Sequence, residues 1–140
     1  MSISITQTEQ KIFFANESFY HAFSHGNLEM MELLWSKIKP ICCIHPGHAP
    51  LQKYEQIMLS WNNILEQSQN TAIECFNPNL SLYGDLALIT CYEVVSGNHL
   101  IATNGFVMEE EDWKMVFHQA GPTVGRPESD ASQKDPGILN

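Results

Sequence analysis

Basic side chains are scarce in this sequence: 7 Lys and Arg residues stand against 16 Asp and Glu, and the formal net charge is −9. A surface of this sign repels the phosphate backbone of nucleic acids and an anionic membrane. The sequence also lacks any run near the ~20 apolar residues of a membrane span. Its first nine residues contain neither the basic nor the apolar segment of a signal peptide. We therefore expect a cytoplasmic protein that binds neither nucleic acid nor membranes.

Motifs for nucleotide and metal binding are missing as well. No glycine-rich phosphate loop, Ser-centred elbow or dinucleotide fingerprint occurs. The four cysteines are Cys42, Cys43, Cys75 and Cys91. In a chain without an export signal they are typical of reduced, buried thiols. Two of them lie near His45 and His48 in a zinc-like cluster, but adjacent strand residues point to opposite faces and no second pair completes a tetrahedron. We expect no metal and no cofactor.

Three segments in the first half of the chain predict helices. A capping box at residues 6–9 starts the first, in which apolar residues recur at three- and four-residue spacing. Gly26 ends this helix, and Asn27 caps a shorter second helix that runs through Trp35. The third helix, over 51–67, has the clearest apolar period.

The remaining segments have a β pattern and are separated by turn residues. Strands are predicted over residues 37–45, 71–83, 86–95, 99–108 and 113–120. Helices followed by hairpins indicate an α+β fold, in which three N-terminal helices pack on one face of a curved, mostly antiparallel sheet. We expect the third helix to lie over the concave side. Residues 1–122 form the domain, and the polar, Pro- and Gly-rich residues 123–140 form a flexible tail.

Two motifs carry a resemblance to a known family. The segment 43–47 reads Cys-Ile-His-Pro-Gly and precedes a helix with Ser60-Trp61, while 113–122 reads Trp-Lys-Met-Val-Phe-His-Gln-Ala-Gly-Pro. Together they resemble a branch of the SnoaL-like, NTF2-like superfamily, over roughly residues 8–122. The resemblance implies a cone-shaped α+β domain with one pocket. It does not imply one activity, because the superfamily includes isomerases, dehydratases, cyclases, binders and association domains.

Three residues are candidates for acid–base catalysis. His45 belongs to the signature His-Pro-Gly and is expected near the mouth of the cone, or else bonded to the backbone of this tight connection. Glu93 is the one carboxylate in an apolar strand, where it is a general base or acid if buried and merely solvated if exposed.

The third candidate, His118, keeps its place in an ending that reads His-His-Ala-Ser-Pro in the resembling proteins. Gln119 and Gly121 replace the second His and the Ser, so a mechanism that needs both imidazoles or the hydroxyl is not supported. Strand alternation groups Lys114, Val116 and His118 on one face. That face is either the pocket or a dimer interface.

Five further residues are candidates for ligand binding. Asn104 suits a hydrogen-bond donor to a ligand oxygen, or else serves a bulge at the following glycine. The others are aromatic residues on the core faces of the helices: Tyr20, Phe23, Trp35 and Trp61. Such residues pack a core, and in a cone with one cavity they also line an enclosed apolar pocket.

Two functions follow from these residues. The first is a small-molecule-binding pocket that runs cofactor-free acid–base chemistry, as an isomerase, dehydratase or cyclase. The second is a non-catalytic ligand-binding or association domain. For both we expect a homodimer, because strand 86–95 is apolar at both parities and neither face of its sheet suits water.

Overall fold

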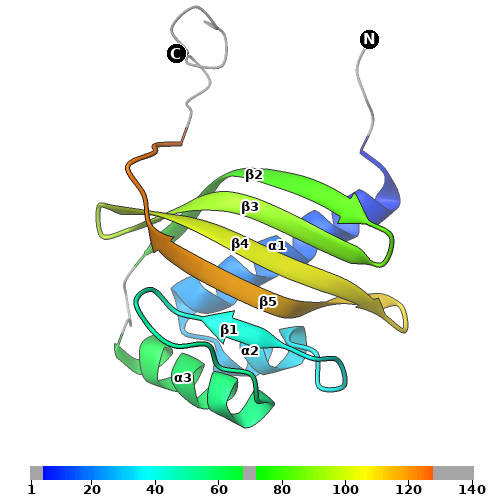
Figure 1. The fold of residues 1–140 in the computed structure, drawn as a ribbon, viewed down its shortest axis with the longest axis horizontal. Helices are drawn as coiled ribbons and strands as arrows, with labels where there is room; N and C mark the ends of the chain where they lie inside the picture. Colours follow the sequence, from blue (N-terminus) through cyan, green and yellow to red (C-terminus); the bar gives the residue numbers. More distant parts are fainter. Residues whose placement is uncertain (1–4, 68–71, 128–140) are drawn as a thin grey trace, which may run out of the picture.

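The computed structural model describes residues 5–67 and 72–127. The elements in chain order are α1 (Gln7–His25), α2 (Leu28–Leu34), β1 (Cys42–Ile44), α3 (Tyr54–Gln67), β2 (Ile73–Tyr83), β3 (Leu86–Val95), β4 (Asn98–Glu109) and β5 (Asp112–Pro122). The strands form one sheet in the order β1-β5-β4-β3-β2, in which only the short β1 runs parallel to its neighbour (Figure 1). The predicted α+β fold, with three helices on a curved and mostly antiparallel sheet, is confirmed. None of the helices in the described residues is long and apolar enough to span a membrane.

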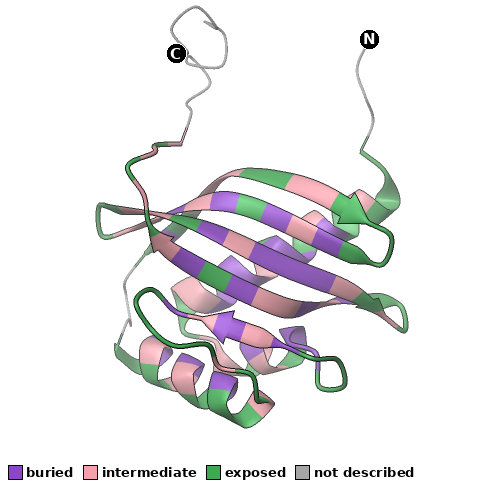
Figure 2. Ribbon diagram, in the orientation of Figure 1, coloured by how far each residue is buried: buried purple, intermediate pink, exposed green. Residues whose placement is uncertain are grey.

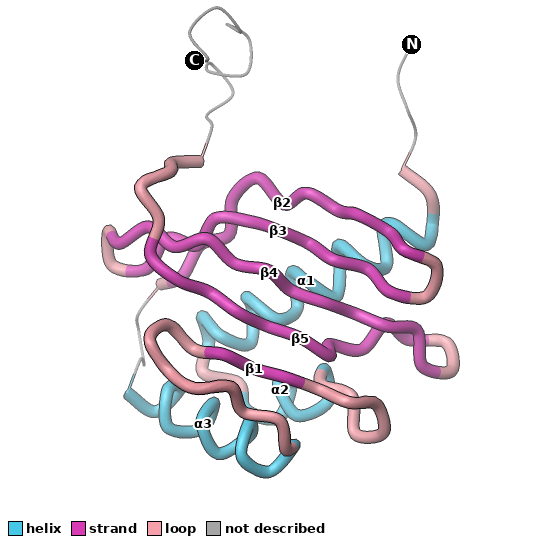
Figure 3. The backbone as a smooth tube through the Cα atoms, in the orientation of Figure 1, coloured by secondary structure: helices cyan, strands magenta, loops and turns pink. Residues whose placement is uncertain are grey.

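The first helix forms where its sequence signals place it. The Thr6 hydroxyl accepts from the Glu9 backbone N–H, and the Glu9 carboxylate accepts from the Thr6 N–H. Gly26 ends the helix in the left-handed conformation that glycine adopts without strain. The helix buries one face, including Ile12 and Phe19, and lies across the sheet behind the four long strands (Figure 3).

The third helix starts later than predicted. It begins at Tyr54, because Leu51 is still extended and pairs with Cys43 through two backbone hydrogen bonds. It lies beyond β1 and next to α2, where the Tyr54 hydroxyl donates to the Glu32 carbonyl at 2.8 Å. The helix that lies behind the four long strands is α1, while Trp61 of α3 contacts Phe19 of α1 and the His118 ring of β5. The expected position of the third helix over the concave side stays a prediction. Hydrophobic period identifies a buried helix face, but it does not identify which layer covers that face.

A β-bulge in β5 overturns the predicted grouping of its side chains. Gly105 pairs with Phe117 and Phe106 pairs with Met115, so Val116 is an extra residue without a partner in the register. Burial, which colours the strands in Figure 2, alternates in β5 up to Met115 and then shifts by one position. This shift turns His118 inward. Val116 and His118 therefore do not share a face. Glycine suits the position opposite the bulge, because a Cβ on Gly105 would lie 3.1 Å from the Phe117 Cβ.

The tail predicted over residues 123–140 falls mostly outside the described residues. Residues 123–127 are described, and the Thr123 N–H donates to the His99 carbonyl at 3.2 Å. The chain that follows β5 is therefore hydrogen-bonded to the start of β4.

Candidate functional site

A cavity of about 700 Å³ lies where the end of α1 and the helix α3 meet the β3–β4 turn and the end of β5. Its lining residues are Phe23, His45, Pro46, His48, Trp61, Ile64, Glu93, Val95, Gly97, Asn98, His99, Leu100, His118, Ala120, Pro122, Thr123 and Arg126. The exposed residues Gly97, Asn98 and Arg126 belong to this lining, so the cavity opens to solvent and is not enclosed as predicted. Its volume is within the usual range for small-molecule sites.

Glu93 is buried in the wall of this cavity, with 2 % of its surface exposed. Its Oε2 accepts a hydrogen bond of 2.6 Å from the Tyr20 hydroxyl. Burial raises the pKa of the Glu93 carboxyl to about 7, while the bond from Tyr20 acts in the opposite direction. The predicted alternative of a solvated Glu93 is wrong, because β3 is a central strand and this position faces α1.

Asn104 joins Glu93 to His118 through a buried network. Its Nδ2 donates to the Tyr20 hydroxyl at 3.1 Å and to Asn16 Oδ1 at 2.8 Å. Its Oδ1 lies 2.6 Å from His118 Nδ1. Asn104 is fully buried and precedes Gly105, at which the register shifts, so the predicted neighbouring bulge is present. Its amide nitrogen donates within the protein and Asn104 is absent from the cavity lining, so the predicted donation to a ligand oxygen stays a prediction.

His118 presents a neutral imidazole to the cavity. Burial, followed by the nearby His45, lowers the pKa of His118 to about 3. The ring lies 4.9 Å from the Phe19 ring and 5.8 Å from the Trp61 ring, measured between centroids. Since Nδ1 carries the proton given to Asn104, Nε2 is the ring atom with a free lone pair.

His45 lies at the other side of the opening and is held by α3. Its Nε2 is 2.9 Å from the Ser60 hydroxyl, and that hydroxyl gives its own proton to the Ile57 carbonyl. The Ser60 oxygen therefore accepts, and the Nε2 of His45 carries the proton. Burial, followed by the neighbouring His48, lowers the pKa of His45 to about 4. The signature pair of His45 and Ser60 thus connects the β1 turn to α3.

The predicted aromatic residues separate into two groups. Phe23 and Trp61 line the cavity with their rings edge to face, 5.2 Å apart. Trp35 does not line it but pairs with Met115 in the core, and Tyr20 lies one layer behind Glu93. Trp35 is therefore not a wall of this cavity, and Tyr20 lines a separate pocket beside α1 together with Asn16 and Cys75. A helical period marks both kinds of residue as inward-facing and cannot separate a wall from the core behind it.

Sequence reasoning missed four contributors to this region. His48, His99 and Arg126 line the cavity, and Asn16 completes the buried network. The available signals were an unusual Asn on the apolar face of α1 and a sole arginine in a segment read as a tail. Within the described residues, no group of three or more His, Cys, Asp and Glu side chains could hold a metal ion.

The model of the SnoaL-like domain family matches residues 12–124. The fold is similar to a proposed dehydratase of the NTF2-like family from Streptomyces avermitilis, with 26% identity, a TM-score of 0.76, and coverage of 83% of this chain and 96% of that one. It is also similar to a proposed calcium/calmodulin-dependent protein kinase type II association domain from Thiobacillus denitrificans, with 22% identity, a TM-score of 0.73, and coverage of 88% and 99%. An NTF2-like protein of unknown function from Pseudomonas putida has 14% identity, a TM-score of 0.76, and coverage of 90% and 96%. A search of the curated proteins found no match.

Proposed function

Since the chain belongs to the SnoaL-like domain family, we propose that its cavity binds a small organic molecule and that Glu93 moves a proton on that molecule. The observation that carries this proposal is the position of the Glu93 carboxyl. One oxygen is fixed by Tyr20, and the same side chain lines an open cavity of about 700 Å³. A carboxyl held in this way is oriented toward a bound molecule before the reaction begins.

The chemistry that suits this carboxyl is proton transfer at a carbon next to a carbonyl group. With its pKa raised to about 7, Glu93 is present in both protonation states near neutral pH. The ionised form removes the proton from carbon, and the electron pair moves into the carbonyl to give an enolate. Where a carbon–carbon double bond adjoins that carbon, the enolate is a dienolate, and the protonated form returns the proton to its far carbon, which moves the double bond into conjugation with the carbonyl and isomerises the molecule. Where a β-hydroxyl is present, the proton goes to the departing hydroxide instead, which releases water.

The neighbouring His118 and the S. avermitilis structure favour a hydroxylated ligand. The free Nε2 of a neutral imidazole accepts a hydrogen bond from a hydroxyl group, and His118 lines the cavity together with Glu93. The similar S. avermitilis protein, at 26% identity, is a proposed dehydratase. Dehydration of a β-hydroxy carbonyl compound is therefore the reaction that we place first. This reaction requires only the side chains of this protein and no cofactor.

Binding is tested with N-phenyl-1-naphthylamine, an uncharged apolar probe whose fluorescence rises on leaving water. We expect it to bind the wild-type protein, and we expect Ile64→Trp, which fills the cavity, to abolish its binding. The matched control is Leu59→Trp, on the exposed side of the same helix. Equal binding by all three proteins would place the probe outside the cavity and contradict the proposal.

Catalysis is tested without knowledge of the natural substrate. The probe is 2-tetralone in D₂O, and proton NMR follows the loss of the signals next to its carbonyl. We expect the wild type to exchange these protons faster than buffer does. The exchange rate of Glu93→Gln should be roughly 100-fold lower than that of the wild type, the scale of general acid–base catalysis. The control, Glu55→Gln, makes the same change on the exposed surface of α3. Probe binding without exchange in the wild type would favour the alternative, a non-catalytic binding or association domain.

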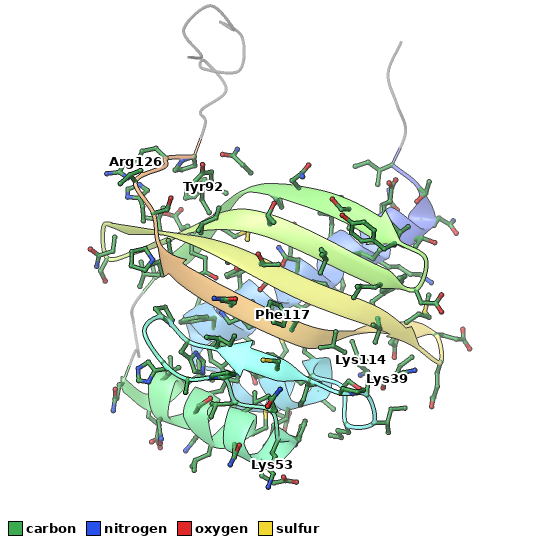
Figure 4. The ribbon with its side chains drawn as sticks, viewed as in Figure 1. Lys39, Lys53, Tyr92, Lys114, Phe117 and Arg126 are labelled. Atoms are coloured by element: carbon green, nitrogen blue, oxygen red, sulfur yellow. The ribbon has the colours of Figure 1, made fainter. Side chains whose placement is uncertain are left out.

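We also propose that two copies of the chain associate through the outer face of the sheet. Leu88, Tyr92, Ile101 and Phe117 alternate with the buried positions of their strands and point away from α1. Figure 4 includes Tyr92 and Phe117 on the side of the sheet that faces the viewer. An apolar face of this kind is typical of a subunit interface.

A further inference from the structure

The cavity of this acidic chain has one cationic side chain in its lining, Arg126. The net charge is −9, with 16 Asp and Glu residues and 6 His. Four of the six histidines line the cavity, at His45, His48, His99 and His118, together with the only arginine of the sequence. Among the described residues that form this lining, Glu93 is the sole acid, and burial favours its neutral form. His45 and His118 are neutral because burial lowers the pKa of each, so Arg126 supplies the positive charge at this opening. In a chain so poor in basic groups, an arginine in this lining indicates an anionic ligand.

Local contacts fix the position of the arginine, Arg126. The segment that follows β5 is tied to β4 by the hydrogen bond from Thr123 to His99, and the Gly125 N–H donates to the Thr123 hydroxyl at 3.0 Å. Gly125 passes so close to Tyr92 that a Cβ at this position would lie 2.8 Å from the tyrosine oxygen. The sequence Thr-x-Gly-Arg therefore brings Arg126 near Tyr92, at the end of the sheet where the cavity opens (Figure 4).

The guanidinium of Arg126 has donors left for a ligand. Its Nη1 donates to the carbonyls of Val124 and Gly125, at 3.2 and 3.0 Å. Neither of these partners is charged, and Arg126 makes no ion pair within residues 5–67 and 72–127. Two carbonyl bonds orient the planar group, and its remaining N–H groups are available to a charged acceptor.

We propose that the ligand is an amphipathic carboxylate, whose carboxylate group binds Arg126 while its apolar part lies against the cavity faces of Phe23 and Trp61. This inference rests on the proposed function and names its substrate class. A carboxylate fits better than a phosphate, because one arginine matches a single negative charge and forms the paired hydrogen bonds of the guanidinium–carboxylate contact. No lysine lines the cavity in the described part of the chain.

The two ends of such a ligand have different surroundings. Arg126 is exposed, whereas Glu93 and His118 are each 2 % exposed. A carboxylate at the rim keeps its charge in contact with water and away from the Glu93 carboxyl. The reacting carbon then lies at the buried end, where Glu93 reaches it. The substrate class is therefore an acid whose carboxylate is separated from its reactive carbonyl by an apolar segment.

The test is displacement of N-phenyl-1-naphthylamine by three compounds with the same apolar part: 2-naphthoate, 2-naphthamide and 2-naphthyl phosphate. We expect the carboxylate to displace the probe at roughly tenfold lower concentration than the neutral amide, the scale of a charge-assisted hydrogen-bond pair. Arg126→Gln should abolish this preference, and Arg126→Lys should retain part of it. Lys53→Gln, which removes the same charge from an exposed position on another face, should keep the full preference (Figure 4).

The outcomes separate the inference from the function on which it rests. Equal displacement by carboxylate and amide, or an unchanged preference in Arg126→Gln, overturns the inference. So does stronger displacement by the phosphate. The exchange of 2-tetralone by the wild type tests the proposed function without any carboxylate, so it can succeed where the inference fails. If neither the probe nor any naphthalene compound binds, the proposed function and this inference are both wrong.

Discussion

Asn104 and His118 face each other across β4 and β5, with Asn104 Oδ1 2.6 Å from His118 Nδ1. The direction of this bond follows from the tyrosine behind it. Tyr20 gives its only hydroxyl proton to Glu93, so it accepts from Asn104, and the contacting atom of Asn104 is the amide nitrogen. The other end of the amide is then oxygen, which accepts from His118. One hydrogen-bond network therefore orients both the Glu93 carboxyl and the His118 imidazole that line the cavity.

This relationship predicts the charge state of His118. Asn104→Asp places a carboxylate against Nδ1, which stabilises the imidazolium and raises the pKa of His118 from about 3 toward or above the ordinary value of 6.5. Nitrogen-15 NMR of the histidine rings measures the change. Asn79→Asp, on the exposed β2 edge, is the control and should leave His118 neutral at pH 6. An imidazolium at His118 in the wild type at pH 6 would contradict the prediction.

A second prediction concerns the pH dependence of stability. The pKa of Glu93 is raised from 4.5 to about 7, so its stabilising contribution is complete below pH 4.5 and is lost as the pH rises to 7. Glu93→Gln removes this loss. Relative to the wild type, the free energy of unfolding of the variant should therefore rise by about 3 kcal/mol between pH 4.5 and 7.5. Urea unfolding at the two pH values measures it.

The buried histidines change stability with pH in the opposite direction, but they do not affect the difference between the wild type and Glu93→Gln. The pKa values of His45 and His118 are lowered to about 4 and 3, so both proteins lose stability as the pH falls below 6.5. Because that loss is common to the wild type and to Glu93→Gln, it drops out of their difference. A difference that stays constant with pH would show that Glu93 is ionised when the protein is folded.

The sequence predicted the elements well because each begins or ends with a strong local signal. Interactions between residues close in sequence determine these signals: the capping box at Thr6, the left-handed Gly26 and the turns between the strands. The bulge at Val116 has no such signal, because it arises where β4 and β5 must pack closely at Gly105. A single inserted residue reverses every later side chain, so the face of His118 could not be read from alternation.

The candidate site could be predicted only in part, because some of its residues have a local signal in the sequence and others depend on contacts between distant segments. Glu93 and Asn104 stand out in the sequence as polar residues in apolar strands, and both prove to be buried and hydrogen-bonded. Arg126 does not stand out, because its position depends on contacts between the end of β5, His99 and Tyr92. Trp35 and Trp61 have the same helical signature, and only the placement of α2 and α3 assigns one to the core and the other to the cavity.

The proposed dimer gives a third prediction. Ile101 is 40 % exposed on the outer face of the sheet, and a lysine there would be buried without a partner in a sheet-to-sheet dimer. We expect Ile101→Lys to be a monomer of about 16 kDa in sedimentation at micromolar concentration, and the wild type to be a dimer. Leu59→Lys makes a matched change on α3, at 62 % exposure, and should remain dimeric. A monomeric wild type would contradict the proposal.

The last prediction separates the positioning role of Tyr20 from a purely structural one. The hydroxyl of Tyr20 donates to Glu93 and opposes the effect of burial, so Tyr20→Phe should raise the pKa of Glu93 above about 7. The exchange of 2-tetralone would then need a higher pH, because Glu93 must be ionised to accept a proton. We expect the rising limb of the pH–rate profile to move to higher pH in the variant, and carbon-13 NMR of the Glu93 carboxyl to titrate with it. Tyr54→Phe, which removes a hydroxyl bonded to a backbone carbonyl on α2, is the control and should leave the profile in place. If Tyr20→Phe lowered the rate equally at every pH, the hydroxyl would not be setting the ionisation of Glu93.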